Sequence, residues 1–129
     1  GKCMYTDLLV QLKNAQAARK EYLKLPYSNL GFAILELLHR YGFIASVQKK
    51  GRMPKRIIEV QLKYTDKEGK IQGIKIVTKP SIKVYRGYRD IRSIRQGYGL
   101  SVVSTSQGLM TGDEARKKKI GGQILFEIW

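Results

Sequence analysis

The chain has 129 residues, of which 43% are hydrophobic, and this is enough to bury the core of one domain or of two small lobes. No window approaches the roughly 18 apolar residues of a membrane span, and the amino-terminal GKCMYTDLL lacks the apolar core of a signal peptide, so we expect a soluble, cytoplasmic protein. The 25 Lys and Arg residues against 10 Asp and Glu give a formal net charge of +15, which favours a polyanionic partner, either nucleic acid or an anionic membrane surface.

Two amphipathic helices are predicted near the amino terminus. Thr6 is a suitable cap for the first helix. Pro26 closes the linker between the helices, Ser28 can cap the second helix, and Gly42 can end it. The apolar positions that define the two faces are Leu8, Leu12 and Ala15 in the first helix and Leu30, Ile34, Leu37, Leu38 and Tyr41 in the second.

Three strands are predicted after these helices. The first covers 43–47, and the basic turn KKGRMPKR at 49–56 leads into the second, where apolar and polar residues alternate over 58–64. After a turn at 65–69, a third strand is expected at 71–76. The two helices and three strands would form one compact α+β lobe.

Short β segments dominate the rest of the chain. Strands are predicted at 82–85, 100–104 and 123–129. Because this change begins at Lys79-Pro80, we expect an amino-terminal lobe at 1–78 and a carboxy-terminal lobe at 79–129. The predicted fold class is therefore α+β, with two small lobes.

The segment 104–122, STSQGLMTGDEARKKKIGG, combines three hydroxyl residues with an acidic pair and a basic run. A hydroxyl nucleophile needs a base within hydrogen-bonding reach, and the only histidine, His39, belongs to the other lobe. A Ser-Lys pair is the alternative, but lysines are so abundant in this chain that their presence is no signal of one, and we expect no enzymatic activity. Thr111, followed by Asp113 and Glu114, fits the capped first turn of a short helix.

Metal, cofactor and membrane sites are not indicated. A single cysteine, Cys3, can form no internal disulfide and, with one histidine, no zinc site. Adjacent acids do not complete an oxygen cage, and the glycines at 97–99 form only half of a dinucleotide motif. Neither predicted helix combines a strongly apolar face with a basic one, as membrane binding requires.

RNA binding accounts for the remaining features. The minor groove of duplex RNA presents 2′-hydroxyls, which suit the small hydroxyl side chains of 104–106, and Gly108 permits close backbone approach. Basic residues of 79–95 would contact the flanking phosphates. Tyr85, Tyr88 and Tyr98 could stack on unpaired bases, although the core of a short strand suits the rings of Tyr85 and Tyr98 equally well.

The chain closely resembles the family of the eighth protein of the small ribosomal subunit. The most specific stretch is GYGLSVVSTSQGLMTGDEARKKKIGGQILFEIW, with the family's Ser-Thr-Ser-x-Gly-x-Met-Thr loop, its Glu-Ala-Arg and its Gly-Gly before the last strand. The family's first helix, the Pro after it and its second helix are similar to the stretch YTDLLVQLKNAQAARKEYLKLPYSNL. The family's entry into its first strand resembles YGFI, and its basic-Pro-Gly segment resembles KPSIKVY. The resemblance runs from Tyr5 to Trp129.

This resemblance implies an α-β-α-β-β amino-terminal lobe and a mainly β carboxy-terminal lobe with short helices. It also implies a cofactor-free, monomeric protein that binds the central domain of small-subunit rRNA, supports subunit assembly and contacts neighbouring ribosomal proteins. An alternative is repression of its own messenger RNA through the same surface. The implied RNA-binding residues are Ser104, Thr105, Ser106, Gln107 and Gly108 of the loop, with Lys55, Lys83, Tyr85, Arg86 and Gln123.

Three positions depart from the family pattern. Gln107 stands where many members have Lys, so one phosphate contact would be lost or supplied by Arg86 or Lys118. Gln123 stands where Glu is usual, and its amide keeps an acceptor, adds a donor and removes a negative charge. Ser81 replaces Gly after the proline, so the turn there can differ.

Overall fold

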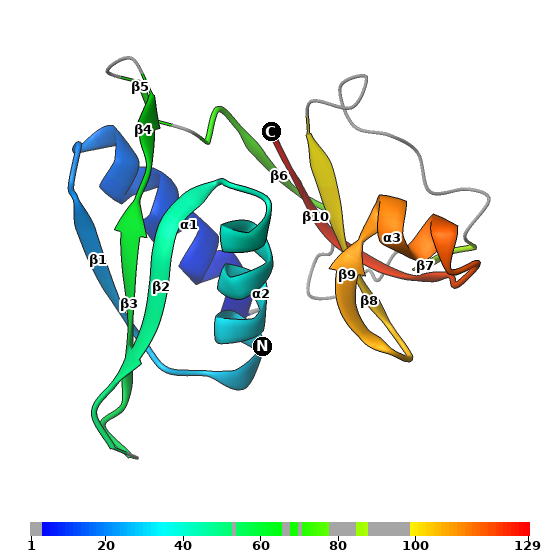
Figure 1. The fold of residues 1–129 in the computed structure, drawn as a ribbon, viewed down its shortest axis with the longest axis horizontal. Helices are drawn as coiled ribbons and strands as arrows, with labels where there is room; N and C mark the ends of the chain where they lie inside the picture. The colour runs from blue at the N-terminus through cyan, green and yellow to red at the C-terminus, as the bar shows by residue number, and fades with distance from the viewer. Residues whose placement is uncertain (1–3, 53, 66–67, 70, 78–84, 88–98) are drawn as a thin grey trace. The chain divides into compact units, whose positions relative to one another are not determined.

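A computed structural model describes most of the chain (Figure 1). Contacts between backbone segments divide it into two compact units, one formed by Met4–Ile71 and one that contains Gln72–Trp129. The described residues are 4–52, 54–65, 68–69, 71–77, 85–87 and 99–129.

The amino-terminal unit has the order α-β-α-β-β that the family resemblance implies, followed by a small hairpin. Its sheet is antiparallel with strand order β1-β3-β2. The elements are α1 (Met4–Ala17), β1 (Tyr22–Pro26), α2 (Asn29–Arg40), β2 (Ile44–Lys50), β3 (Ile57–Leu62), β4 (Tyr64–Thr65) and β5 (Glu68–Gly69).

Helix α2 begins and ends where the sequence indicated. The Ser28 hydroxyl accepts a hydrogen bond from the Gly31 backbone N–H at 3.0 Å, and Gly42 adopts a φ of +83°, which favours glycine, just after the helix. At the ends of the expected apolar face, Leu30 and Tyr41 are 39% and 42% exposed. The buried face is narrower and consists of Ile34, Leu35, Leu37 and Leu38.

Two predictions for the start of this unit were wrong. Thr6 lies within α1, because the helix already begins at Met4. The expected linker contains β1, whose Leu23 and Leu25 pair with Val60 and Ile58 of β3. Apolar residues two apart can indicate a strand, and here the buried neighbours on β3 stabilise the extended conformation despite Pro26 at its end.

The expected third strand of this sheet belongs to the other unit. Ile74–Ile76 forms β6, which pairs with Phe126–Ile128 near the carboxy terminus. Two backbone hydrogen bonds of 3.0 Å join Gly73 and Trp129 and continue this pairing. Alternating residues predict a strand but carry no information about its partner, which is chosen by packing far along the chain.

The carboxy-terminal unit contains a five-stranded antiparallel sheet and a short helix. Its strand order is β6-β10-β8-β9, and β7 also pairs with β10. Its most buried apolar side chains include Val102, Met110, Ala115, Phe126 and Ile128, each at most 3% exposed, and Met110 of the sheet packs on Ala115 of the helix. The elements are β6 (Ile74–Ile76), β7 (Tyr85–Arg86), β8 (Leu100–Thr105), β9 (Gly108–Thr111), α3 (Gly112–Lys117) and β10 (Gly122–Ile128).

Two of the three strands predicted for this region are confirmed with small changes of boundary, as β8 and β10. The third, at 82–85, lies outside the described residues except at Tyr85, as do the arginines at 89, 92 and 95. The two-lobed α+β fold class is confirmed: each unit has its own sheet, with helices beside it.

Candidate nucleic-acid interface

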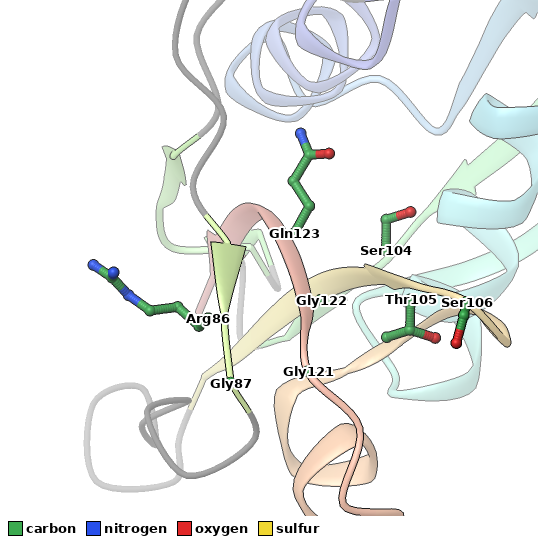
Figure 2. Close-up of a pocket in the computed structure, with 8 residues that line it drawn as sticks. All are labelled: Arg86, Gly87, Ser104, Thr105, Ser106, Gly121, Gly122 and Gln123. Carbon is green, nitrogen blue, oxygen red and sulfur yellow. The ribbon is translucent and has the colours of Figure 1, made fainter.

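An open groove of about 530 Å³ lies on the carboxy-terminal unit (Figure 2). Three segments form it: the end of β8 with the turn after it, β7 with the residue after it, and the start of β10. In Figure 2 the Arg86 side chain extends on one side of β10, and the Ser104–Ser106 segment lies on the other. The lining residues are Arg86, Gly87, Ser104, Thr105, Ser106, Gly121, Gly122 and Gln123.

The glycine pair before β10 brings these segments together. A Cβ on Gly122 would lie 2.5 Å from the carbonyl oxygen of Ser104, and one on Gly121 would lie 2.6 Å from that of Arg86. Side chains at these positions would therefore push β10 away from β8 and β7. With glycine, Gln123 pairs with Ser104 on one side and with Tyr85 on the other.

The hydroxyl group of Thr105 closes the turn between β8 and β9. It donates a hydrogen bond to the Gly108 carbonyl oxygen at 2.8 Å and accepts one from the Gln107 backbone N–H at 3.1 Å. Gly108 has a φ of +108°, a conformation that other residues rarely adopt. Thr105 therefore fixes the shape of the turn.

The two serine hydroxyls of the loop are arranged differently. Ser104 is half-buried at the end of β8, whereas Ser106 is exposed at the tip of the turn. In the part of the chain that the structure describes, neither hydroxyl has a hydrogen-bond partner. Both can donate and accept a hydrogen bond toward a bound molecule.

The capping interpretation of Thr111 is confirmed. Its hydroxyl accepts a hydrogen bond from the Glu114 backbone N–H at 3.2 Å, at the start of α3. Asp113 lies in the first turn and forms an ion pair with Arg116. Because Ala115 packs on Met110 of β9, the capped helix supports the strand that leaves the hydroxyl turn.

Replacing Thr111 by alanine should lower the free energy of unfolding by about 1 kcal/mol, because the Glu114 N–H loses its acceptor in a buried position. Urea denaturation of the full chain measures this change. Thr111→Ser keeps the acceptor and should retain most of the stability. An equal loss in both variants would mean that the methyl group, and not the cap, is important.

The other predicted RNA-binding residues fall in different parts of the structure. Gln107 is exposed in the turn, and Arg86 and Gln123 line the groove. The backbone of Tyr85 pairs with Gln123, whereas Lys83 lies outside the described residues. Lys55 is exposed in the β2–β3 turn and belongs to the amino-terminal unit. The structure thus brings the loop, Arg86 and Gln123 together.

The glycines are the site residues whose role the sequence reasoning missed. In the sequence, Gly121 and Gly122 were noted only as part of the family motif, and no packing function was assigned to them. Two successive glycines directly before a strand are a signal of close backbone approach, and that signal could have identified them.

Other chemistries find little support. Within the described ranges, no three His, Cys, Asp or Glu side chains are grouped as a metal ion would require. His39 is exposed at the end of α2. Burial raises the pKa of Tyr64, with a smaller opposing effect of Arg19, and its hydroxyl donates to the Lys20 carbonyl oxygen at 2.6 Å in a contact within the amino-terminal unit. Every helix found in the described segments is too short or too polar to cross a membrane.

Comparison with known proteins identifies the family. Residues 4–129 match the family described as Ribosomal protein S8. The small ribosomal subunit protein uS8 of Mycoplasmopsis synoviae (strain 53) is 41% identical over 126 residues, or 96% of this chain and 95% of the relative. The same protein of Lysinibacillus sphaericus (strain C3-41) is 40% identical over 124 residues, or 95% and 94%. This chain therefore belongs to the ribosomal protein S8 family of the small ribosomal subunit, which is not a family of enzymes.

Proposed function

We propose that this protein binds small-subunit rRNA directly and supports assembly of the small subunit in a bacterial-type ribosome. The main observation is the groove, where Ser104 and Ser106, whose hydroxyls have no partner among the described residues, lie on one side and Arg86 on the other. The net charge of +15 and the bacterial relatives support the same proposal. The protein would be monomeric when free and would work in the cytoplasm beside other small-subunit proteins.

The mechanism combines two kinds of contact. Ser104 and Ser106 would exchange hydrogen bonds with 2′-hydroxyls and base edges across the minor groove of an RNA helix. Arg86, helped by Lys83 and Lys55, would contact phosphates and supply affinity without reading sequence.

Pre-organisation of the turn makes these contacts favourable. Because Thr105 already holds the turn closed through two hydrogen bonds, little backbone freedom is lost when RNA binds. Thr105 thus contributes to affinity mainly by positioning its neighbours. The Gln123 amide, at the start of β10, would add both a donor and an acceptor to the groove, and Tyr85 would place its ring against a base.

Ser106→Ala should weaken binding to a small-subunit rRNA fragment by about 1 to 3 kcal/mol, because a buried RNA hydroxyl loses its partner. The free energy of unfolding should hardly change, since Ser106 is exposed and bonded to no described residue. Filter binding and urea denaturation measure the two quantities.

Ser46→Ala is a matched control on β2 of the amino-terminal unit, where the serine hydroxyl bonds to Gln61. It should leave RNA affinity unchanged. A loss of stability without a loss of affinity in Ser106→Ala would show that the loop is structural.

Repression of the protein's own messenger RNA is a further possibility for the same groove, since shape and backbone recognition accept any RNA helix with the same irregular form. A competition titration between a small-subunit rRNA fragment and the messenger RNA tests it. Displacement of one RNA by the other is expected, and simultaneous binding would contradict a shared site.

A further inference from the structure

The amino-terminal unit carries a cluster of aromatic and basic side chains that lies outside the groove. The cluster draws its residues from the end of β2, from the position before β3, and from the segment around the start of α2. Its four members, which we call the cation–aromatic cluster, are Tyr27, Phe32, Lys49 and Arg56.

Backbone pairing places the two cations on the same face of the sheet. Lys49 of β2 lies opposite Ile58 of β3, so its side chain is on the face that carries the buried Ile58. Arg56 directly precedes β3, and its guanidinium lies on this same side because it contacts the Tyr27 ring that Lys49 also contacts. The backbone N–H of Tyr27 donates to the Arg56 carbonyl oxygen at 3.2 Å, which brings the ring to this position.

Both cations contact the same aromatic ring. The Lys49 Nζ atom lies 4.8 Å from the ring centre of Phe32 and 5.7 Å from that of Tyr27, and the Arg56 Cζ atom lies 5.3 Å from that of Tyr27. These distances are within the range of cation–π attraction. The Tyr27 hydroxyl donates to the Asn29 Oδ1 atom at 3.0 Å, so the ring itself is held in place.

Across the described part of the chain, neither Lys49 nor Arg56 forms an ion pair. Among the same residues, Arg56 donates a hydrogen bond only through its Nε atom, in a long contact of 3.4 Å to the Gly51 carbonyl oxygen, so its two terminal nitrogens are available there. On the other face of the same strands, Lys50 pairs with Glu59 at 2.9 Å.

We infer that the cation–aromatic cluster is a second RNA-binding site, which holds backbone phosphates through Lys49 and Arg56. Two like charges held near one ring repel each other, and an anion between or beside them removes that cost. The rings restrict both long side chains before the ligand arrives, so less entropy is lost on binding.

A chain of phosphates suits this arrangement better than a single one. Lys49 lies nearer to the Phe32 ring than to the Tyr27 ring, whereas Arg56 lies over the Tyr27 ring, so successive phosphates of one strand can engage the two cations in turn. This inference goes beyond the groove, since the cluster shares no residue with it and belongs to the other unit. It would hold even if the groove did not bind RNA.

An NMR titration of the full chain with an octameric oligouridylate tests the inference. We expect the backbone amides of Tyr27, Lys49 and Arg56 to shift. The double variant K49Q/R56Q should weaken the affinity read at Tyr27 at least about tenfold and reduce the dependence of log affinity on log salt by roughly two. Amides of 104–106 report the groove separately, so failure at one site is distinguishable from failure at the other.

K24Q/K63Q is the matched control, because it removes the same charge from two exposed lysines of the same unit that, like Lys49 and Arg56, form no ion pair with a described residue. It should change the affinity at Tyr27 by less than about twofold. An equal effect of the two double variants on affinity would overturn the inference. So would a titration in which oligouridylate shifts the amide resonances of 104–106 but not that of Tyr27. If inorganic phosphate shifted the Tyr27 amide resonance as strongly as oligouridylate does at the same phosphate concentration, the assignment to a polynucleotide would be wrong.

Discussion

Gly122→Ala should lower the free energy of unfolding by about 2 kcal/mol and weaken binding to small-subunit rRNA at least about tenfold. The new Cβ would meet the Ser104 carbonyl oxygen at 2.5 Å and Val103 Cγ1 at 2.8 Å. A backbone oxygen cannot rotate away, so β10 must move from β8. That movement separates Gln123 from Ser104, which are paired across the two strands.

Urea denaturation and filter binding measure the two effects of this change. Gln107→Ala is a stability control in the same loop, because its side chain is exposed, and the free energy of unfolding should change by less than about 0.5 kcal/mol. If Gly122→Ala folded with unchanged stability and bound RNA normally, close approach of β10 to β8 would not be what builds the groove.

Affinity for rRNA should fall steeply as salt rises. If the protein neutralises about six phosphates, the association constant decreases about a thousandfold between roughly 50 and 200 mM salt, because each contact releases condensed counterions. Contact with about six phosphates is consistent with the net charge of +15, with Arg86 in the groove and with the proposed contacts of Lys49 and Arg56.

Filter binding of a small-subunit rRNA fragment across this range measures the slope. Circular dichroism at each salt concentration is the control, and it should show the same folded protein throughout. A nearly flat dependence would mean that phosphate contacts supply little of the affinity, and the electrostatic half of the mechanism would be wrong.

Local patterns predicted the elements of the fold better than their partners. The start of α2 after Ser28 and its end before Gly42 were predicted correctly, because helix caps depend on a few adjacent residues. The segment Ile74–Ile76 was recognised as a strand but placed in the wrong sheet. Its partner, β10, lies about fifty residues further along the chain, and no local pattern specifies such a pairing.

The candidate site was predicted in composition but not in its division of roles. The sequence pointed to all three hydroxyls of the loop as contacts, and the structure shows that the Thr105 hydroxyl is already used within the turn. That difference depends on the positive φ of Gly108 and on a hydrogen bond across the turn, neither of which is visible in the residue types alone. The cap at Thr111 was predictable because its acceptor, acids and helix are contiguous.

Directed hydroxyl-radical probing from position 106 tests most directly whether the loop contacts small-subunit rRNA. Because Cys3 is the only cysteine, a C3S/S106C variant carries a single attachment point for an iron chelate. We predict strong cleavage on both strands of one irregular rRNA helix, and weak or different cleavage when the chelate is placed by K75C on β6 instead. Absence of cleavage from position 106 in a stable complex, or the same pattern from both positions, would contradict the proposed interface.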